Sequence, residues 1–181
     1  MMERNAKELG REILTVPNAL SLLRLLMVPV VVVLILAGRD TLAVAVFVLA
    51  AVTDFVDGKI ARRTRPTYIG AILDPVADRL MLSSVGVALA IRGFLPAWVV
   101  TILVGRDLLA LLGSLKYRGK VRVNPVGKAA TATLMIGAAL IIFSPGPLGT
   151  AIFYVGFGLT LIAALLYFFS VARISGGGGA L

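Results

Sequence analysis

Long apolar runs separated by short polar segments dominate this chain. A transmembrane helix needs about 20 mostly apolar residues, and six stretches reach that length. They cover residues 17–38, 41–62, 70–91, 94–117, 125–143 and 148–172. The pattern predicts an all-α membrane protein, a bundle of six transmembrane helices that forms a single domain over residues 16–174.

The two ends of the chain lack such runs. Residues 1–15 mix charged and apolar positions, which predicts an N-terminal amphipathic helix lying on the membrane surface. Residues 175–181 contain four consecutive glycines, which predicts a flexible tail.

The composition strengthens the membrane interpretation and narrows the chemistry. Hydrophobic residues make up 59% of the chain and charged residues only 15%, against about 25% charged in a typical soluble domain. The chain contains no Cys and no His. This excludes disulfides, thiolate or imidazole metal ligands, and Ser-His or Cys-His catalytic pairs. Carboxylates, hydroxyls, Lys and Arg remain as reactive groups.

Positive charge gathers in alternate loops of the predicted bundle. The net charge is +9, and most Lys and Arg residues lie in the two termini, around residues 59–65, and in the segment 116–128. The positive-inside rule then places both termini and these loops on the cytoplasmic side of an inner (cytoplasmic) membrane. In so apolar a chain, this charge indicates anionic lipid or phosphate substrates rather than nucleic acid.

Five aspartates lie inside the predicted spans, where each charge costs about 2.5–3.5 kcal/mol on insertion scales, and four of them form two pairs. Asp54 and Asp57 are three residues apart near the end of the second span, and Asp74 and Asp78 are four apart near the start of the third. Each spacing puts a pair on one helix face. The two helices are antiparallel and joined by a short loop, so the pairs can face each other.

Carboxylates that lie this close together repel one another unless cations neutralise them. Ligands that offer only oxygen favour Mg²⁺ or Mn²⁺, and two such ions are a common arrangement in phosphoryl chemistry. Gly58 leaves room for a ligand to approach the backbone, Ala61 keeps the same face small, and Arg62 can bind phosphate oxygens in a bidentate way. Three other hypotheses stay open: paired structural acids, a small cation-coupled membrane transporter, and a non-catalytic scaffold.

The order of these residues resembles a family signature. Asp54-x2-Asp57-Gly58-x2-Ala61-Arg62, followed by Gly70-x3-Asp74-x3-Asp78, is similar to that of the CDP-alcohol phosphatidyltransferases. Seven residues separate Arg62 from Gly70 here, where the family usually has eight. The six-span layout matches over nearly the whole chain.

This resemblance implies a phospholipid-synthesis enzyme that binds CDP-diacylglycerol. The hydroxyl of an alcohol attacks the β-phosphorus, and CMP leaves. By position, Asp54, Asp57 and Asp74 bind metal, while Asp78 completes the metal site and acts as general base. The residues that the resemblance places against the CDP moiety are Asn18, Ser21, Gly58, Ala61, Arg62 and Gly70. Many small members are dimers, so the resemblance also implies a homodimer.

A second basic group is the predicted site for the acceptor alcohol. It comprises Arg106, Lys116, Lys120, Arg122 and Lys128, and its surroundings resemble the branch of phosphatidylglycerophosphate synthases and eukaryote-like cardiolipin synthases. A phosphate-bearing acceptor, glycerol 3-phosphate, suits this charge; phosphatidylglycerol, which would give cardiolipin, is the alternative. A local pair between Arg106 and Asp107 is also open, although adjacent residues do not face each other on a helix.

Overall fold

The computed structural model describes residues 16–61, 70–116 and 125–176. The described residues form six helices and no strand: α2 (Val16–Leu36), α3 (Asp40–Ala61), α4 (Gly70–Ile91), α5 (Ala97–Lys116), α6 (Pro125–Phe143) and α7 (Pro147–Gly176). Each helix coincides within four residues with one predicted span, which confirms the all-α class. The predicted surface helix over residues 1–15 lies outside the described residues. So does most of the predicted tail, although α7 extends to Gly176.

The turn between α2 and α3 shows why the first apolar run stops where it does. Gly38 has a φ of 70°, a left-handed conformation that glycine adopts without a steric cost. The Gly38 amide donates to the Ile35 carbonyl at 3.0 Å, and the Arg39 amide donates to the Leu34 carbonyl at 2.9 Å. These two bonds form a Schellman cap, so the chain reverses within three residues and α3 begins at once.

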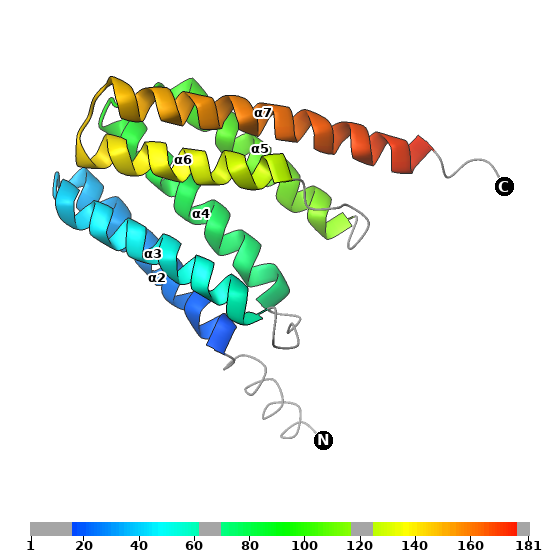
Figure 1. The fold of residues 1–181 in the computed structure, drawn as a ribbon, viewed down its shortest axis with the longest axis horizontal. Coiled ribbons are helices and arrows are strands. Elements are labelled where there is room, and N and C mark those ends of the chain that lie inside the picture. The colour runs from blue at the N-terminus through cyan, green and yellow to red at the C-terminus, as the bar shows by residue number, and fades with distance from the viewer. Residues whose placement is uncertain (1–15, 62–69, 117–124, 177–181) are drawn as a thin grey trace, which may run out of the picture. The chain divides into compact units, whose positions relative to one another are not determined.

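The described helices belong to two compact units, one ending at Gly93 and the other beginning at Phe94. We call them the N-terminal and C-terminal units. In the N-terminal unit, α2 packs against both α3 and α4. Figure 1 shows the starts of α2 and α4 and the end of α3 together at one end of this unit. The core between these helices is apolar toward the opposite end, where Ile35, Phe47 and Leu89 are buried.

An ion pair joins two helices at that opposite end. The two terminal guanidinium nitrogens of Arg92, Nη1 and Nη2, donate to the carboxylate oxygens Oδ1 and Oδ2 of Asp40. The distance from Nη2 to Oδ2 is 3.3 Å. Asp40 is the first residue of α3, and Arg92 directly follows α4. The bidentate pair therefore joins the start of α3 to the end of α4, so these two helix ends lie at the same level.

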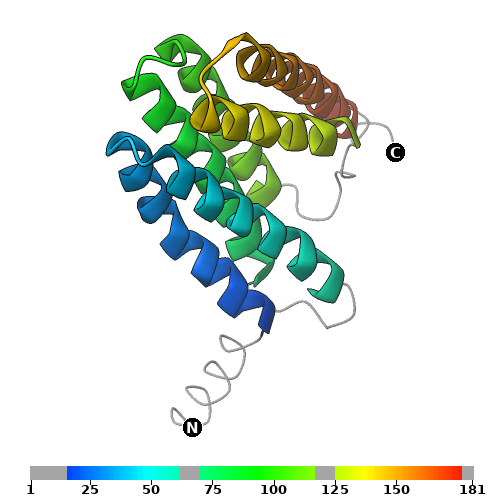
Figure 2. The same ribbon diagram turned by 60° about the vertical axis from the view of Figure 1, so that its left-hand side comes forward.

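The C-terminal unit is built on an antiparallel hairpin of α6 and α7, visible in Figure 2. Glycines allow the two backbones to meet closely. A Cβ atom at Gly137 would lie 2.5 Å from the backbone nitrogen of Phe153, and one at Gly156 would lie 2.7 Å from that of Leu134. The α5 helix reaches α7 through the edge-to-face contact of Trp98 with Phe157, whose ring centroids are 6.0 Å apart.

Two of the described helical segments are long and apolar enough to cross a membrane, Pro125–Phe143 and Pro147–Leu166. Three shorter apolar segments, Leu20–Leu36, Asp40–Thr53 and Arg79–Ile91, lie in the N-terminal unit. Large apolar side chains are exposed along these helices, among them Leu26 and Val33, each more than 60% exposed. Soluble proteins rarely expose so much contiguous apolar surface.

Candidate active site

The buried face of α2 changes from apolar to polar along its length. Val31 and Ile35 are fully buried in its second half, and Ser21 and Arg24, in its first half, are each only 3% exposed. The outward face of the same helix carries exposed leucines and valines, among them Leu22, Leu26, Val30 and Val33. In the first half of α2, polar side chains therefore lie inside and apolar ones outside, the reverse of a helix in a soluble protein.

The α3 helix carries the first aspartate pair on the continuation of its buried stripe. Ala43, Phe47 and Ala50 are buried and follow each other in steps of four and three residues. The next positions in this repeat are Asp54 and Asp57. Because side chains at these spacings share one helix face, the stripe that packs on α2 leads directly to the two aspartate positions.

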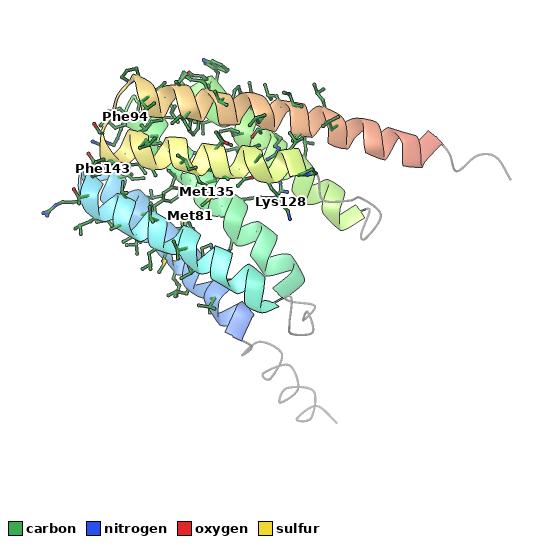
Figure 3. All side chains as sticks on the ribbon, viewed as in Figure 1. Met81, Phe94, Lys128, Met135 and Phe143 are labelled. Carbon is green, nitrogen blue, oxygen red and sulfur yellow. The ribbon has the colours of Figure 1, made fainter. Side chains whose placement is uncertain are left out.

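The α4 helix repeats this arrangement in the opposite direction. Ala88, Val85 and Met81 are buried in the N-terminal unit, and Met81 is labelled in Figure 3. Counting back from Met81 in steps of three and four residues leads to Asp78 and Asp74. Both aspartate pairs thus continue stripes that are buried in the same three-helix unit.

The Arg92–Asp40 ion pair shows that the two aspartate pairs are level. Asp54 lies 14 residues after Asp40, and Asp78 lies 14 residues before Arg92. At 1.5 Å per helical residue, both positions lie about 21 Å from the ion pair. The structure therefore brings the four aspartate positions to one end of the unit, at corresponding depths of two antiparallel helices.

The donor chemistry of this place fits a hard divalent cation. Four carboxylates without thiolate or imidazole suit Mg²⁺ or Mn²⁺, and the polar half of the α2 stripe lies at the same end of the unit. Among the residues whose side chains the structure describes, no cluster of three or more His, Cys, Asp or Glu is present. The four aspartate side chains lie outside that set, so the coordination geometry stays a prediction.

The predicted CDP-binding positions within the described residues lie at the same end of the N-terminal unit. Gly58 and Ala61 are in the last turn of α3, and Gly70 is the first residue of α4. Ser21 is buried on α2, and Asn18 lies one turn before it. Arg62 lies outside the described residues.

The predicted acceptor residues belong to the C-terminal unit. Arg106 lies in the middle of α5, Lys116 is its last residue, and the exposed Lys128 is in the first turn of α6 (Figure 3). Lys120 and Arg122 lie outside the described residues. Nη1 of Arg106 donates to Oδ1 of Asp107 over 2.9 Å. The argument from helix spacing against this pair is wrong, because the long arginine side chain can turn back to its neighbour.

Two charged residues of the interior were absent from the predicted site. Asp107, 8% exposed, engages Arg106, and Arg24 shares the buried face of Ser21. Arg24 could have been found from the sequence, because it follows Ser21 by one helical turn inside an apolar run. Asp107 carries a signal of the same kind, because it is an acid inside the predicted span 94–117.

Comparison with known proteins identifies the class to which this fold and site belong. The family profile of CDP-alcohol phosphatidyltransferases matches residues 14–168. The chain therefore belongs to the CDP-alcohol phosphatidyltransferase family, and it is an enzyme that transfers a phosphatidyl group from CDP-diacylglycerol to an alcohol with release of CMP.

Individual relatives carry the names of two activities in this family. The chain is 38% identical to a CMP-forming cardiolipin synthase of Streptomyces coelicolor, over 90% of this chain and 85% of that protein. It is 41% identical to a putative cardiolipin synthase of Mycobacterium tuberculosis, over 69% of this chain and 63% of that protein. It is 32% identical to a CDP-diacylglycerol–glycerol-3-phosphate 3-phosphatidyltransferase of Salmonella choleraesuis, over 87% of this chain and 94% of that protein.

Proposed function

We propose that the four aspartates form the metal-dependent catalytic centre of the phosphatidyl transfer. The proposal is supported by the buried stripes of α3 and α4, which lead along the sequence to the four aspartate positions, and by the buried Ser21 and Arg24 at the same end of the N-terminal unit. Asp54, Asp57, Asp74 and Asp78 hold one or two Mg²⁺ or Mn²⁺ ions. When bound, the metal neutralises charge that develops on the diphosphate.

The residues of the chain divide the remaining work. Asp78 accepts the proton of the acceptor hydroxyl as its oxygen bonds to the β-phosphorus. The bond from that phosphorus to the oxygen bridging the two phosphates breaks, and CMP leaves with the bonding electrons. Gly58 and Ala61 leave room for the nucleotide, and Arg62 binds phosphate oxygens. Asn18 and Ser21 contact the nucleotide from α2, and Gly70 lets α4 begin close to it.

For the acceptor we infer phosphatidylglycerol, which makes the product cardiolipin. The cardiolipin synthase of Streptomyces coelicolor and the putative one of Mycobacterium tuberculosis are 38% and 41% identical to the chain, against 32% for the glycerol-3-phosphate transferase of Salmonella. Glycerol 3-phosphate is the second candidate, favoured by the match to 94% of that transferase and by the basic residues Arg106 and Lys128.

All six helices cross the membrane in this proposal, with the catalytic end of the N-terminal unit on the cytoplasmic side. The two long apolar helices α6 and α7 support it, as does the exposed apolar surface of α2. The basic residues around positions 59–65 and 116–128 support the orientation through the positive-inside rule. The homodimer stays a prediction from the family.

An acceptor panel with the purified protein tests the activity. We expect CMP release from CDP-diacylglycerol with phosphatidylglycerol as acceptor, and none when EDTA removes divalent metal; mass analysis of the lipid identifies the product. If CMP is released with glycerol 3-phosphate but not with phosphatidylglycerol, glycerol 3-phosphate is the acceptor. A protein that releases no CMP with any alcohol, yet moves cations across vesicle membranes, would support the transporter hypothesis instead.

Arg106 is expected to act on the acceptor side. Arg106→Gln should raise the acceptor KM about tenfold, the size expected for loss of one charge-assisted hydrogen bond, and leave the KM for CDP-diacylglycerol nearly unchanged. Arg92→Gln removes the arginine of the other described ion pair and serves as the control, with both KM values unchanged. Equal increases in both KM values for Arg106→Gln would contradict an acceptor role.

A further inference from the structure

Arg24 is a permanent charge in the interior of the N-terminal unit. The residue is 3% exposed, and a guanidinium does not lose its proton in proteins. It lies on α2, the helix that packs against both α3 and α4. A charge taken out of water in this way is very costly unless anions compensate for it.

The position of Arg24 along α2 indicates which anions these are. The helices α2, α3 and α4 contain five acids: Asp40, Asp54, Asp57, Asp74 and Asp78. Asp40 is bound to Arg92 at the opposite end of the unit. Arg24 lies 12 residues before the end of α2, or about 18 Å from it, farther than an arginine side chain extends.

The other four acids lie at the same end of the N-terminal unit as Arg24. Asp54 and Asp78 lie about 21 Å from the Arg92–Asp40 pair, within one helical turn of the level of Arg24. The α2 stripe that buries Arg24 faces the core of the unit, and the aspartate positions continue the buried stripes of α3 and α4. Arg24 is therefore level with Asp54 and Asp78, and Asp57 and Asp74 lie about one turn beyond them at the same end of the three-helix unit.

We propose that Arg24 is a positioning residue that acts as the built-in counter-cation of the aspartate cluster. It offsets the mutual repulsion of the carboxylates and keeps them in place before metal and substrate bind. This inference rests on the proposed metal site. Arg24 and the bound metal then both neutralise the carboxylates. Loss of the arginine therefore lowers the stability of the metal-free protein more than that of the metal-loaded protein.

The test compares Arg24→Met with Arg92→Met, matched changes at two buried or half-buried arginines of one unit. Thermal unfolding of the purified protein in detergent is followed by circular dichroism, in EDTA and in saturating Mn²⁺. In EDTA, Arg24→Met should lower the midpoint by about 10 °C, the scale of a broken buried ion pair in a chain of this length. Saturating Mn²⁺ should restore most of the lost midpoint. The rise in midpoint on adding Mn²⁺ should therefore be larger for Arg24→Met than for the wild type.

Arg92→Met should lower the midpoint in EDTA and in Mn²⁺ alike, because its ion pair lies about 21 Å from the aspartates. Arg24→Lys keeps the charge and should fall between the wild type and Arg24→Met. By linkage, Arg24→Met also binds Mn²⁺ about tenfold or more tightly, which electron paramagnetic resonance of free Mn²⁺ measures without any turnover.

Other outcomes have distinct meanings. If Mn²⁺ raises the unfolding midpoint of Arg24→Met no more than that of the wild type, the counter-cation role is overturned. Weaker Mn²⁺ binding by that variant also overturns it. A loss of affinity for CDP-diacylglycerol with a normal Mn²⁺ gain would make Arg24 a substrate ligand and also overturns it. If the wild type itself shows no Mn²⁺ gain and no metal-dependent CMP release, the proposed metal site fails, whatever Arg24 does.

Discussion

Replacing Asp78 by Asn is expected to lower the rate of CMP release by about 10³-fold, the usual scale for losing a general base. Asparagine has nearly the shape of aspartate but accepts no proton at neutral pH and carries no charge for metal. Asp78 lies three residues before the buried Met81 on α4, and the proposed site needs its charge both for metal and for the proton of the acceptor hydroxyl. The measurement is CMP release at saturating CDP-diacylglycerol, acceptor and Mn²⁺.

Asp40→Asn is the matched control for this prediction. It makes the same chemical change in the same unit, at the Arg92 ion pair about 21 Å from Asp54. Asp40→Asn should keep most of the activity at temperatures well below its unfolding midpoint. An Asp78→Asn protein that retains more than a tenth of the wild-type rate would show that another group accepts the proton.

A clear loss of stability is expected when a side chain is added at the glycine contacts of α6 and α7. Gly156→Ala places a methyl group 2.7 Å from the backbone nitrogen of Leu134, so the two helices must move apart. Overpacking of this kind costs about 1–3 kcal/mol, and Gly156→Leu should cost more. Unfolding of the purified protein in mixed detergent and sodium dodecyl sulfate micelles measures the change.

Gly158→Ala provides a control two residues away on the same helix. A Cβ atom at Gly158 meets nothing within 4 Å, and alanine is the better helix former by about 1 kcal/mol. Gly158→Ala should therefore be neutral or slightly stabilising. If both variants lowered stability equally, the cost at Gly156 would not arise from the close approach of α6.

The helices of this protein could be predicted from the sequence almost completely. An apolar segment in lipid must satisfy its backbone hydrogen bonds internally, so length and hydropathy alone define a helix. Glycine or polar residues then mark its ends, as Gly38 does after α2. The aspartate spacing is equally local: Asp54 and Asp57 share a face of any helix that contains them.

Contacts between helices were much less predictable. The sequence shows that Arg106 and Asp107 are adjacent, but the reach of the arginine side chain decides that they pair. It shows glycines in α6 and α7, but only the register of the hairpin sets Gly137 against Phe153 and Gly156 against Leu134. Many pairings of six apolar helices bury similar area, and composition does not choose among them.

The sequence by itself thus determined the helices, the two aspartate pairs and the oxygen-only chemistry, because each depends on neighbours within a few residues. The tertiary structure decided that α2 packs against both α3 and α4, that the Arg92–Asp40 pair joins these two helices at the end away from the aspartates, and that Arg24 is buried at the depth of Asp54 and Asp78. These facts depend on packing between segments far apart in the chain, which local periodicity does not encode.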